Sequence, residues 1–399
     1  MRKDETGLNQ GMFELASGAE VNAYYDKVMQ QRFLPSGRVR YFPMSNYTDD
    51  GRIVSLLSGA ETSVTVRLKT VDATRFSPNV PSTHTRNFSV ADGVRVVPPN
   101  DLPQLWRTRA GESAPRRFCI LGAGKTAMDV GVWLLRHGVP ASAIHWVMPR
   151  DSWLQNRRNV QPTAEFFHHS IGGEANKMAA FADSSTIDEV FLRLEAAGQM
   201  IRLDRSRMPT MFHYAIISEG EIELLRTITQ IIRMGRVKTI EPDALVMDKG
   251  RVAMAPGTLY IDCTASALTY PRSEAVFQGD RIVVQVLRAP LITFSAALIA
   301  YVEAHGINDA IKNEMCKPVP MPRNLAGYAA ATLVSMANQM RWSQDDALRK
   351  WLRASRLDGY GKLIAEVPRD DAERQAVIAR LKASMAPAAA NMRKLMAAA

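Results

Sequence analysis

The clearest pattern along the chain is an apolar run followed by glycines and then by apolar residues at helical spacing. The run Phe118-Cys119-Ile120-Leu121 predicts a buried strand. The helix after the glycines is expected to end near His137-Gly138, since glycine commonly terminates helices. Its apolar face consists of Met128, Val132, Leu134 and Leu135. These residues predict a strand, a tight turn and a helix in direct succession.

A second buried strand is expected at residues 143–148, after Gly138-Val139-Pro140 has ended the helix. Because strand, helix and strand follow one another, they form a βαβ unit with parallel strands. Further strands are expected at 237–240, 244–247, 259–262 and 282–286, and further helices at 186–197, 219–234 and 291–303. This alternation predicts an α/β fold with a Rossmann-like domain.

The two ends of the chain have a different pattern. Apolar residues at helical spacing predict a helix over residues 21–31. Short apolar runs at 39–42, 53–56 and 64–68 predict strands of a small antiparallel meander. From Asn324 onward the chain is expected to be helical, with fraying in the alanine-rich end after Ala386.

Composition narrows the class of protein. With 399 residues, of which 46% are hydrophobic and 23% charged, the chain is typical of a globular protein with two or three domains. The longest apolar run, residues 291–302, contains Thr293 and Ser295 and is expected to form a buried helix, not a membrane span. Three widely separated cysteines and a charged N-terminus without a signal-peptide pattern favour the cytoplasm.

The formal net charge of +10 raises the question of a nucleic-acid partner. The basic residues are spread along the chain, and neither a zinc-finger spacing nor an RNA-binding aromatic motif is present. A basic surface also attracts a polyanionic cofactor, which is the simpler interpretation. We therefore expect a small-molecule substrate, no nucleic acid and no membrane contact, and we leave assembly into a homo-oligomer open.

The turn itself has the sequence Gly-x-Gly-x-x-Ala, formed by Gly122, Ala123, Gly124, Lys125, Thr126 and Ala127. The first glycine allows the positive φ of a tight turn, and the second lets the backbone approach a pyrophosphate. The small Ala127 lets the helix lie close to the sheet, and the helix N-terminus attracts the phosphates. A glycine turn selected only for packing is the alternative, and the strand and helix around the motif favour a dinucleotide site.

The residues after the second strand bear on the choice of nucleotide, since this position contacts the adenosine ribose. Arg150 lies where an arginine can bind a 2′-phosphate, and Arg157-Arg158 follow shortly afterwards. Asp151 could instead accept a hydrogen bond from a free 2′-hydroxyl. We favour NADP over NAD, with solvated loop charges as the alternative interpretation of the arginines.

Other chemistries find little support. The chain lacks a Cys-x-x-Cys pair, a Gly-x-Ser-x-Gly elbow and a complete phosphate-binding Lys-Thr loop. We expect the neighbouring residues His168-His169 to lie in a loop without a metal. A polar and aromatic loop at residues 153–157 is expected near the carboxyl ends of the strands, where it could contact cofactor or substrate.

The central motif, the helix with Tyr24-Tyr25 and the stretch 259–266 together resemble two-dinucleotide-domain flavoproteins, a family related to flavin monooxygenases and pyridine-nucleotide oxidoreductases. In that family an NADP domain is inserted within an FAD domain. The resemblance implies four parts: 1–111 as the first part of the FAD-type domain, 112–270 as the NAD(P) domain, 271–323 as the return to the FAD-type domain, and 324–399 as a helical C-terminal region. Gly279-Asp280 is expected to be a turn.

The chain departs from this family at its N-terminal end. The family opens with its own Gly-x-Gly-x-x-Gly turn for FAD, and no such motif precedes residue 118. A true start upstream of Met1, a truncation and a lost flavin site are all compatible with this, and we favour the first. FAD is therefore expected if the missing segment is present.

These observations predict an NAD(P)H-dependent FAD-type oxidoreductase, in which hydride passes from NADPH to flavin as in monooxygenases of this type. No side chain can be assigned as a catalytic acid or base. A flavin-less NADP-binding or redox-sensing protein without turnover is the alternative. A subunit that binds nothing would not need Gly122 and Gly124.

Overall fold

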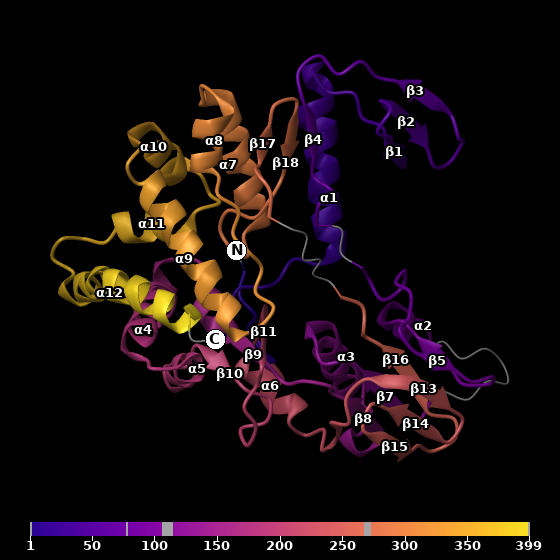
Figure 1. The fold of residues 1–399 in the computed structure, drawn as a ribbon. Coiled ribbons are helices and arrows are strands. Elements are labelled where there is room, and N and C mark those ends of the chain that lie inside the picture. Colours follow the sequence, from indigo (N-terminus) through magenta and orange to yellow (C-terminus); the bar gives the residue numbers. More distant parts are fainter. Residues whose placement is uncertain (1, 77–78, 106–114, 267–272, 398–399) are drawn as a thin grey trace.

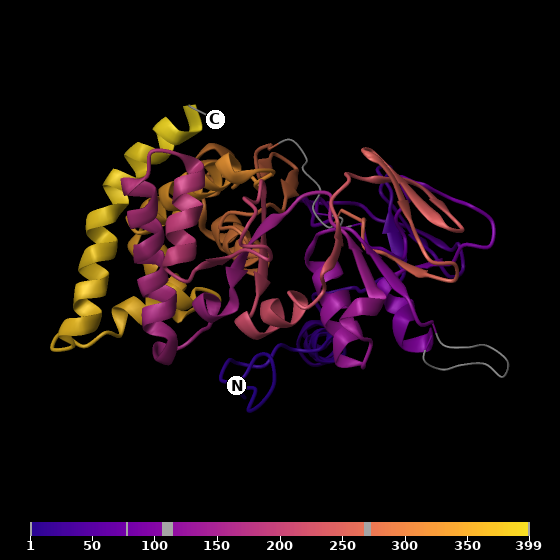
Figure 2. The same cartoon turned by 90° about the horizontal axis from the view of Figure 1, so that it is seen from below.

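The computed structural model describes residues 2–76, 79–105, 115–266 and 273–397 (Figure 1). A Rossmann-like unit is built on a parallel sheet, and a mainly helical body that includes the C-terminus lies beside it (Figure 2). The fold is mixed α/β, as predicted. Among the helices of the described residues, none combines the length and apolarity needed to cross a membrane.

The parallel sheet has the strand order β12-β8-β7-β16-β6, and each neighbouring pair is parallel. Its strands are β6 (Val96–Val97), β7 (Phe118–Leu121), β8 (Ile144–Val147), β12 (Gln230–Ile232) and β16 (Leu259–Asp262). The predicted strands around the glycine turn and at 259–262 are thus confirmed. The predicted helix 219–234 is wrong in its second half, because α6 (Glu219–Leu225) ends early and β12 pairs with β8.

The sheet is covered on both faces, which explains why its strands are apolar throughout. Phe118 and Ile120 face α3 (Lys125–Arg136) and α6, while Cys119 and Leu121 face a second, smaller sheet. That sheet has the order β15-β14-β13-β5. Its strands are β5 (Ser89–Val90), β13 (Val237–Glu241), β14 (Ala244–Met247) and β15 (Gly250–Ala253). The Rossmann-like unit therefore has three layers.

Residues 152–217, inside the predicted range 112–270, form a sheet of their own that packs on C-terminal helices. The sheet has the order β10-β9-β11, with β9 (Ser152–Asn156), β10 (Met200–Ile201) and β11 (Met211–Ile217). Its core also contains residues of α4 (Phe167–Asp183), α5 (Ile187–Ala196), α9 (Leu325–Trp342) and α12 (Ala372–Ala397). Figure 2 shows α12 alongside α4.

Three predictions for this region are wrong. The expected loop at 153–157 is strand β9 followed by a 3-10 turn, because its Trp153 and Leu154 are buried between layers. His168-His169 lie in α4, not in a loop. The helix after Ala386 is not frayed, because Ala388 and Met392 are fully buried against the same core.

The remaining elements surround a small sheet, β17-β18-β4, whose strands are β4 (Thr70–Asp72), β17 (Phe277–Gln278) and β18 (Arg281–Val283). Gly279, with φ +68°, forms the predicted turn between β17 and β18. Beside the sheet lie α7 (Ile292–His305) and α8 (Asp309–Met315), followed later in the chain by α10 (Asp346–Ala354) and α11 (Gly359–Ala365). Helices are thus confirmed at 291–303 and after Asn324.

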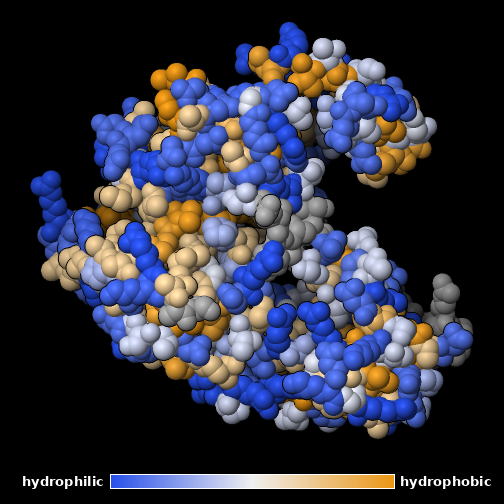
Figure 3. All heavy atoms as spheres, in the orientation of Figure 1, coloured by the Kyte–Doolittle hydropathy of each residue, from blue (hydrophilic) through white to orange (hydrophobic). Residues whose placement is uncertain are grey.

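The N-terminal segment is the most exposed part of the structure. Helix α1 (Gly18–Val28) confirms the predicted helix but has no buried residue. The meander consists of β1 (Ser45–Tyr47), β2 (Arg52–Ser55) and β3 (Glu61–Ser63). A short α2 (Leu102–Leu105) follows β6 and packs on the core of the Rossmann-like unit. The strands predicted at 39–42 and 64–68 are wrong, because the turns at Gly51 and Gly59 set a different register. Figure 3 shows a hollow between this segment and the Rossmann-like unit.

The shared core of residues 152–217 and the C-terminal helices gives a stability prediction. Phe191 is fully buried and its ring contacts the rings of Trp153 and Tyr328, whereas its neighbour Leu192 is 42% exposed. Phe191→Ala should lower the free energy of unfolding by about 3–5 kcal/mol. Leu192→Ala should change it by less than about 0.5 kcal/mol. Urea unfolding measures both, and equal effects of the two substitutions would contradict this packing.

Candidate dinucleotide site and the adjoining cavity

The turn between β7 and α3 can be made only by glycine at its first position. Gly122 has φ +115°, and a Cβ on it would lie 2.7 Å from the backbone oxygen of Cys263. Its N–H donates to the carbonyl oxygen of Val147 at 3.0 Å. The turn is therefore held between the carboxyl ends of β8 and β16, at the edge of the sheet where open α/β folds bind ligands.

The side chain of Trp146 holds the same turn in place through a hydrogen bond. Its ring is fully buried, and Nε1 donates to the carbonyl oxygen of Gly122 at 2.7 Å. This bond satisfies a carbonyl that the bend removes from any strand ladder. Trp146 is thus part of the framework that supports the turn.

The second glycine leaves the start of α3 open. Gly124 is the N-cap of the helix, no side chain caps it, and no atom lies within 4 Å of the place where a Cβ would stand. The first N–H groups of a helix have no partner within the helix and attract anions. Ala127 is fully buried against the sheet, as the motif requires. The geometry therefore suits a pyrophosphate placed over Gly124 and Lys125.

The three predicted arginines lie in different surroundings. Arg150 is exposed and lines the cavity, and it forms no ion pair with any described residue. Arg157 also lines the cavity, but it is buried and Nη2 donates to the carbonyl oxygen of Phe13 at 2.6 Å. Arg158 is exposed and is not among the residues around the cavity. The structure thus brings Arg150 and Arg157, but not Arg158, to the cavity that contains the glycine turn.

Asp151 is engaged by the protein itself. Arg233, just after β12, donates to both carboxylate oxygens of Asp151 at 3.0 Å and lies 3.2 Å from Asp204. Two further cations of the cavity, Arg236 and Lys238, follow Arg233 in the chain. Sequence reasoning missed this basic segment because it placed residues 219–234 in a helix, so that the residues after the third parallel strand received no attention.

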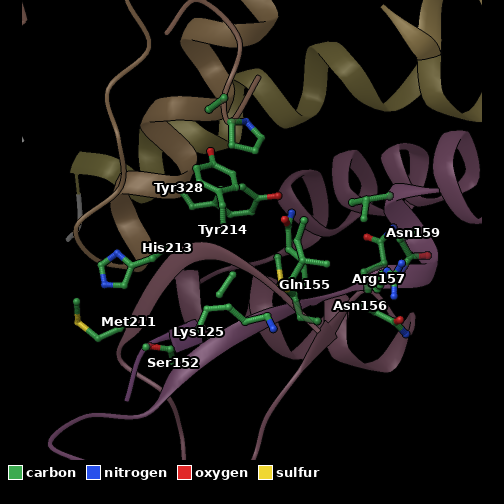
Figure 4. Close-up of a pocket in the computed structure, with 18 of the residues that line it drawn as sticks. Lys125, Ser152, Gln155, Asn156, Arg157, Asn159, Met211, His213, Tyr214 and Tyr328 are labelled. Carbon is green, nitrogen blue, oxygen red and sulfur yellow. The ribbon is translucent and has the colours of Figure 1, made fainter. Parts of the chain in front are cut away.

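A cavity of about 1670 Å³ extends from the glycine turn into the helical body. Ligand pockets commonly measure about 300–1,000 Å³, so this one has room for a dinucleotide and a second ligand. Figure 4 shows Lys125 and Ser152 near the turn and Tyr214 and Tyr328 at another part of the wall. Strands β9 and β11 and helices α4, α9, α11 and α12 contribute much of the further lining.

Asp262, at the end of β16, organises the loop beside the turn. It is buried, and Oδ1 accepts hydrogen bonds from the backbone N–H and the hydroxyl of Thr264. Its Oδ2 lies 2.9 Å from Nε2 of His84 and 3.3 Å from Nε of Arg86. These contacts position Thr264 in the cavity wall. No motif around His84 indicated its part in this contact.

Thiol and metal chemistry find no support among the described residues. The three cysteines are buried and unpaired, and burial raises the pKa of the Cys119 and Cys263 thiols well above the usual range. Such thiols stay protonated at neutral pH and are poor nucleophiles. No group of three or more His, Cys, Asp or Glu side chains in the described parts of the chain could hold a metal ion.

The two glycines of the turn should respond differently to the same added methyl group. Gly122→Ala should destabilise the fold by about 1–3 kcal/mol, because the alanine would meet a backbone oxygen at a positive φ. Gly124→Ala should leave the thermal unfolding temperature unchanged, because its φ of −82° suits any residue and the space is open. Differential scanning calorimetry compares the two variants, and equal losses would contradict the described turn.

The chain is 40% identical over 396 residues to an uncharacterised protein of Mycobacterium tuberculosis (strain ATCC 25618 / H37Rv), covering 99% of this chain and 72% of that protein. Uncharacterised proteins of Mycobacterium tuberculosis (strain CDC 1551 / Oshkosh) and Mycobacterium bovis (strain ATCC BAA-935 / AF2122/97) match with the same values. No protein-family profile matches the sequence.

Among solved structures, the crystal structure of L-lysine 6-monooxygenase from Pseudomonas syringae aligns with 83% of this chain and 77% of its own, at 12% identity and a TM-score of 0.33. The mycobacterial relatives match nearly the whole length of the sequence at 40% identity. The chain therefore belongs to the family of these uncharacterised mycobacterial proteins.

Proposed function

We propose that this chain binds NADPH at the Gly122–Ala127 turn and acts as an NAD(P)H-dependent oxidoreductase. The observation that carries the proposal is the turn itself. Gly122 takes φ +115° against Cys263, Gly124 leaves an uncapped helix start, and both open into a cavity of about 1670 Å³. A turn selected for packing alone would need the first glycine but not the second.

The basic groups near the turn support NADP over NAD. Arg150 follows the second parallel strand and has no ion pair among the described residues, so its guanidinium is available to a 2′-phosphate. Asp151, which could have accepted from a 2′-hydroxyl, is occupied by Arg233. Arg236 adds a further cation to the cavity lining, whereas Lys238 lies 3.8 Å from Asp248.

The chain's own residues would bind and orient the coenzyme. The backbone at Gly122–Lys125 would hold the pyrophosphate, and Arg150 would hold the adenosine end. The apolar wall formed by α4, α9 and α12 would keep water from the reacting end of the cavity. A bound nicotinamide coenzyme supplies the hydride, and the protein supplies its position.

A flavin has no comparable cradle in the described residues. They form one strand–glycine turn–helix motif, at β7 and α3, and the sheet β17-β18-β4 carries none. This observation favours the second candidate function, an NADP-binding or redox-sensing protein that binds no flavin and has no turnover.

Arg150→Ala should weaken NADPH binding about 10- to 100-fold, because it removes charge-assisted hydrogen bonds to the 2′-phosphate. NADH binding should change by less than about twofold, since NADH lacks that phosphate. Isothermal titration with both nucleotides makes the comparison, with Arg158→Ala as the control outside the cavity. Equal effects on NADPH and NADH would rule out the assigned role of Arg150.

Gel filtration of the purified chain after incubation with FAD distinguishes the two candidate functions. We expect a colourless protein that binds NADPH, because the described residues offer a single dinucleotide turn. NADPH consumption with free FAD added, above the rate without protein, would support the oxidoreductase. Binding without consumption would favour the flavin-less alternative, and failure to bind NADPH would contradict both.

A further inference from the structure

The cavity differs in charge between its two ends. Near the glycine turn, the Arg150 and Arg236 side chains form no ion pair with described residues. In the helical body, the cations with limited exposure each have a partner inside the protein: Arg157 donates to the carbonyl oxygen of Phe13, and two others form ion pairs. Lys177 lies 2.6 Å from Glu174, and Arg288 lies 2.9 Å from Asp358. Lys382, which also lines the cavity, is exposed to solvent and keeps its hydration.

Three tyrosines of the cavity wall lie around the Glu174–Lys177 pair. They come from β11, α9 and α11, and they are Tyr214, Tyr328 and Tyr360. The rings of Tyr214 and Tyr328 meet edge to face, with centroids 5.9 Å apart (Figure 4). The rest of this end is largely apolar, lined by Met178, Met336, Ile364, Ile378 and Leu381.

The phenol hydroxyls of Tyr214 and Tyr328 are free to bind a ligand. Neither makes a hydrogen bond to a described residue, and neither is sealed away from the cavity as the hydroxyl of Tyr260 is. Burial raises the pKa of both phenols, and nearby Glu174 raises it further, so both remain protonated donors at neutral pH. Unused donors in an apolar wall give a ligand its orientation.

The backbone at Tyr214 is held in an unfavourable conformation. Tyr214 has φ +57°, in the left-handed region that bulky residues avoid. It lies where β11 shifts register against β9 between Phe212 and Ile216. Bulges of this kind redirect a side chain, and here the bulge accompanies a tyrosine in the cavity wall. This backbone conformation of Tyr214 has a higher free energy than a regular strand, and the surrounding structure maintains it.

We propose that this end of the cavity is the substrate subsite, and that it takes an uncharged, largely aromatic or apolar molecule with an oxygen that binds Tyr214 and Tyr328. An ionised ligand would bring an unpaired charge into a region whose charges already have partners, which is unfavourable. The inference rests on the proposed function for the identity of the reaction, but the subsite itself can be tested by binding alone.

Three probes with one aromatic body and different charges test the subsite: 4-ethylphenol is neutral, 4-hydroxybenzoate anionic and tyramine cationic at neutral pH. Binding is measured by titration calorimetry with and without saturating NADPH, which on the proposed function would occupy Arg150. We expect 4-ethylphenol to bind at least about tenfold more tightly than either charged probe. Equal or tighter binding of a charged probe overturns the proposal, as does no binding of any of the three.

Substitutions at the subsite separate specific contacts from general loss of structure. Tyr214→Phe and Tyr328→Phe should each weaken 4-ethylphenol binding about 3- to 10-fold, because each removes one hydrogen bond. Tyr24→Phe, at an exposed tyrosine of α1, is the matched control and should have no effect. If neither cavity variant weakens binding while circular dichroism shows an intact fold, the subsite assignment is overturned.

Changes of charge at the same place should change the preferred probe. Glu174→Gln leaves Lys177 without its partner and should shift the preference at least about tenfold toward 4-hydroxybenzoate. Lys177→Met leaves the Glu174 carboxylate without its partner and should shift the preference toward tyramine. Unchanged preferences would contradict the proposal. A separate NADPH titration of each variant distinguishes failure of the subsite from failure of the nucleotide site, since the two are measured independently.

Discussion

The contact between Gly122 and the backbone of Cys263 is the constraint on which the arrangement of this protein depends. At this point the end of β7 bends into α3 while the end of β16 passes within 2.7 Å of where a side chain would begin. The bond from Gly122 to Val147 and the bond from Trp146 to Gly122 connect β8 to the same turn. Three parallel strands therefore end at one place, and the cavity opens there.

The parts that sequence reasoning predicted are those determined by neighbouring residues. The strand 118–121, the glycine turn, α3 and β8 each have a strong local pattern, and Ala127 is buried as the motif implies. The missed elements are determined by distant partners. β12 became a strand because it pairs with β8, and β9 because it lies between β10 and β11.

The candidate site divides in the same way. The glycines could be identified from the sequence, because their spacing is typical of the tight turn between a strand and a helix. The roles of Tyr214 and Tyr328 could not, because a register shift in β11 and the packing of α9 bring them together. Likewise, Arg150 and Asp151 are neighbours in the sequence, but only the structure shows that they have different partners. Arg233, which follows β12, donates hydrogen bonds to the Asp151 carboxylate and leaves Arg150 without an ion pair among the described residues.

The connections between the two bodies have a consequence for how the cavity can change shape. β8 ends at Val147 and β9 begins at Ser152, while β11 ends at Ile217 and α6 begins at Glu219. These two short connections enter and leave the parallel strand pair β9–β11 at its opposite ends. Because Arg150 lies within residues 148–151 and Tyr214 lies in β11, the length of this one connection limits how far the arginine can lie from the tyrosines, and an insertion there would enlarge the cavity.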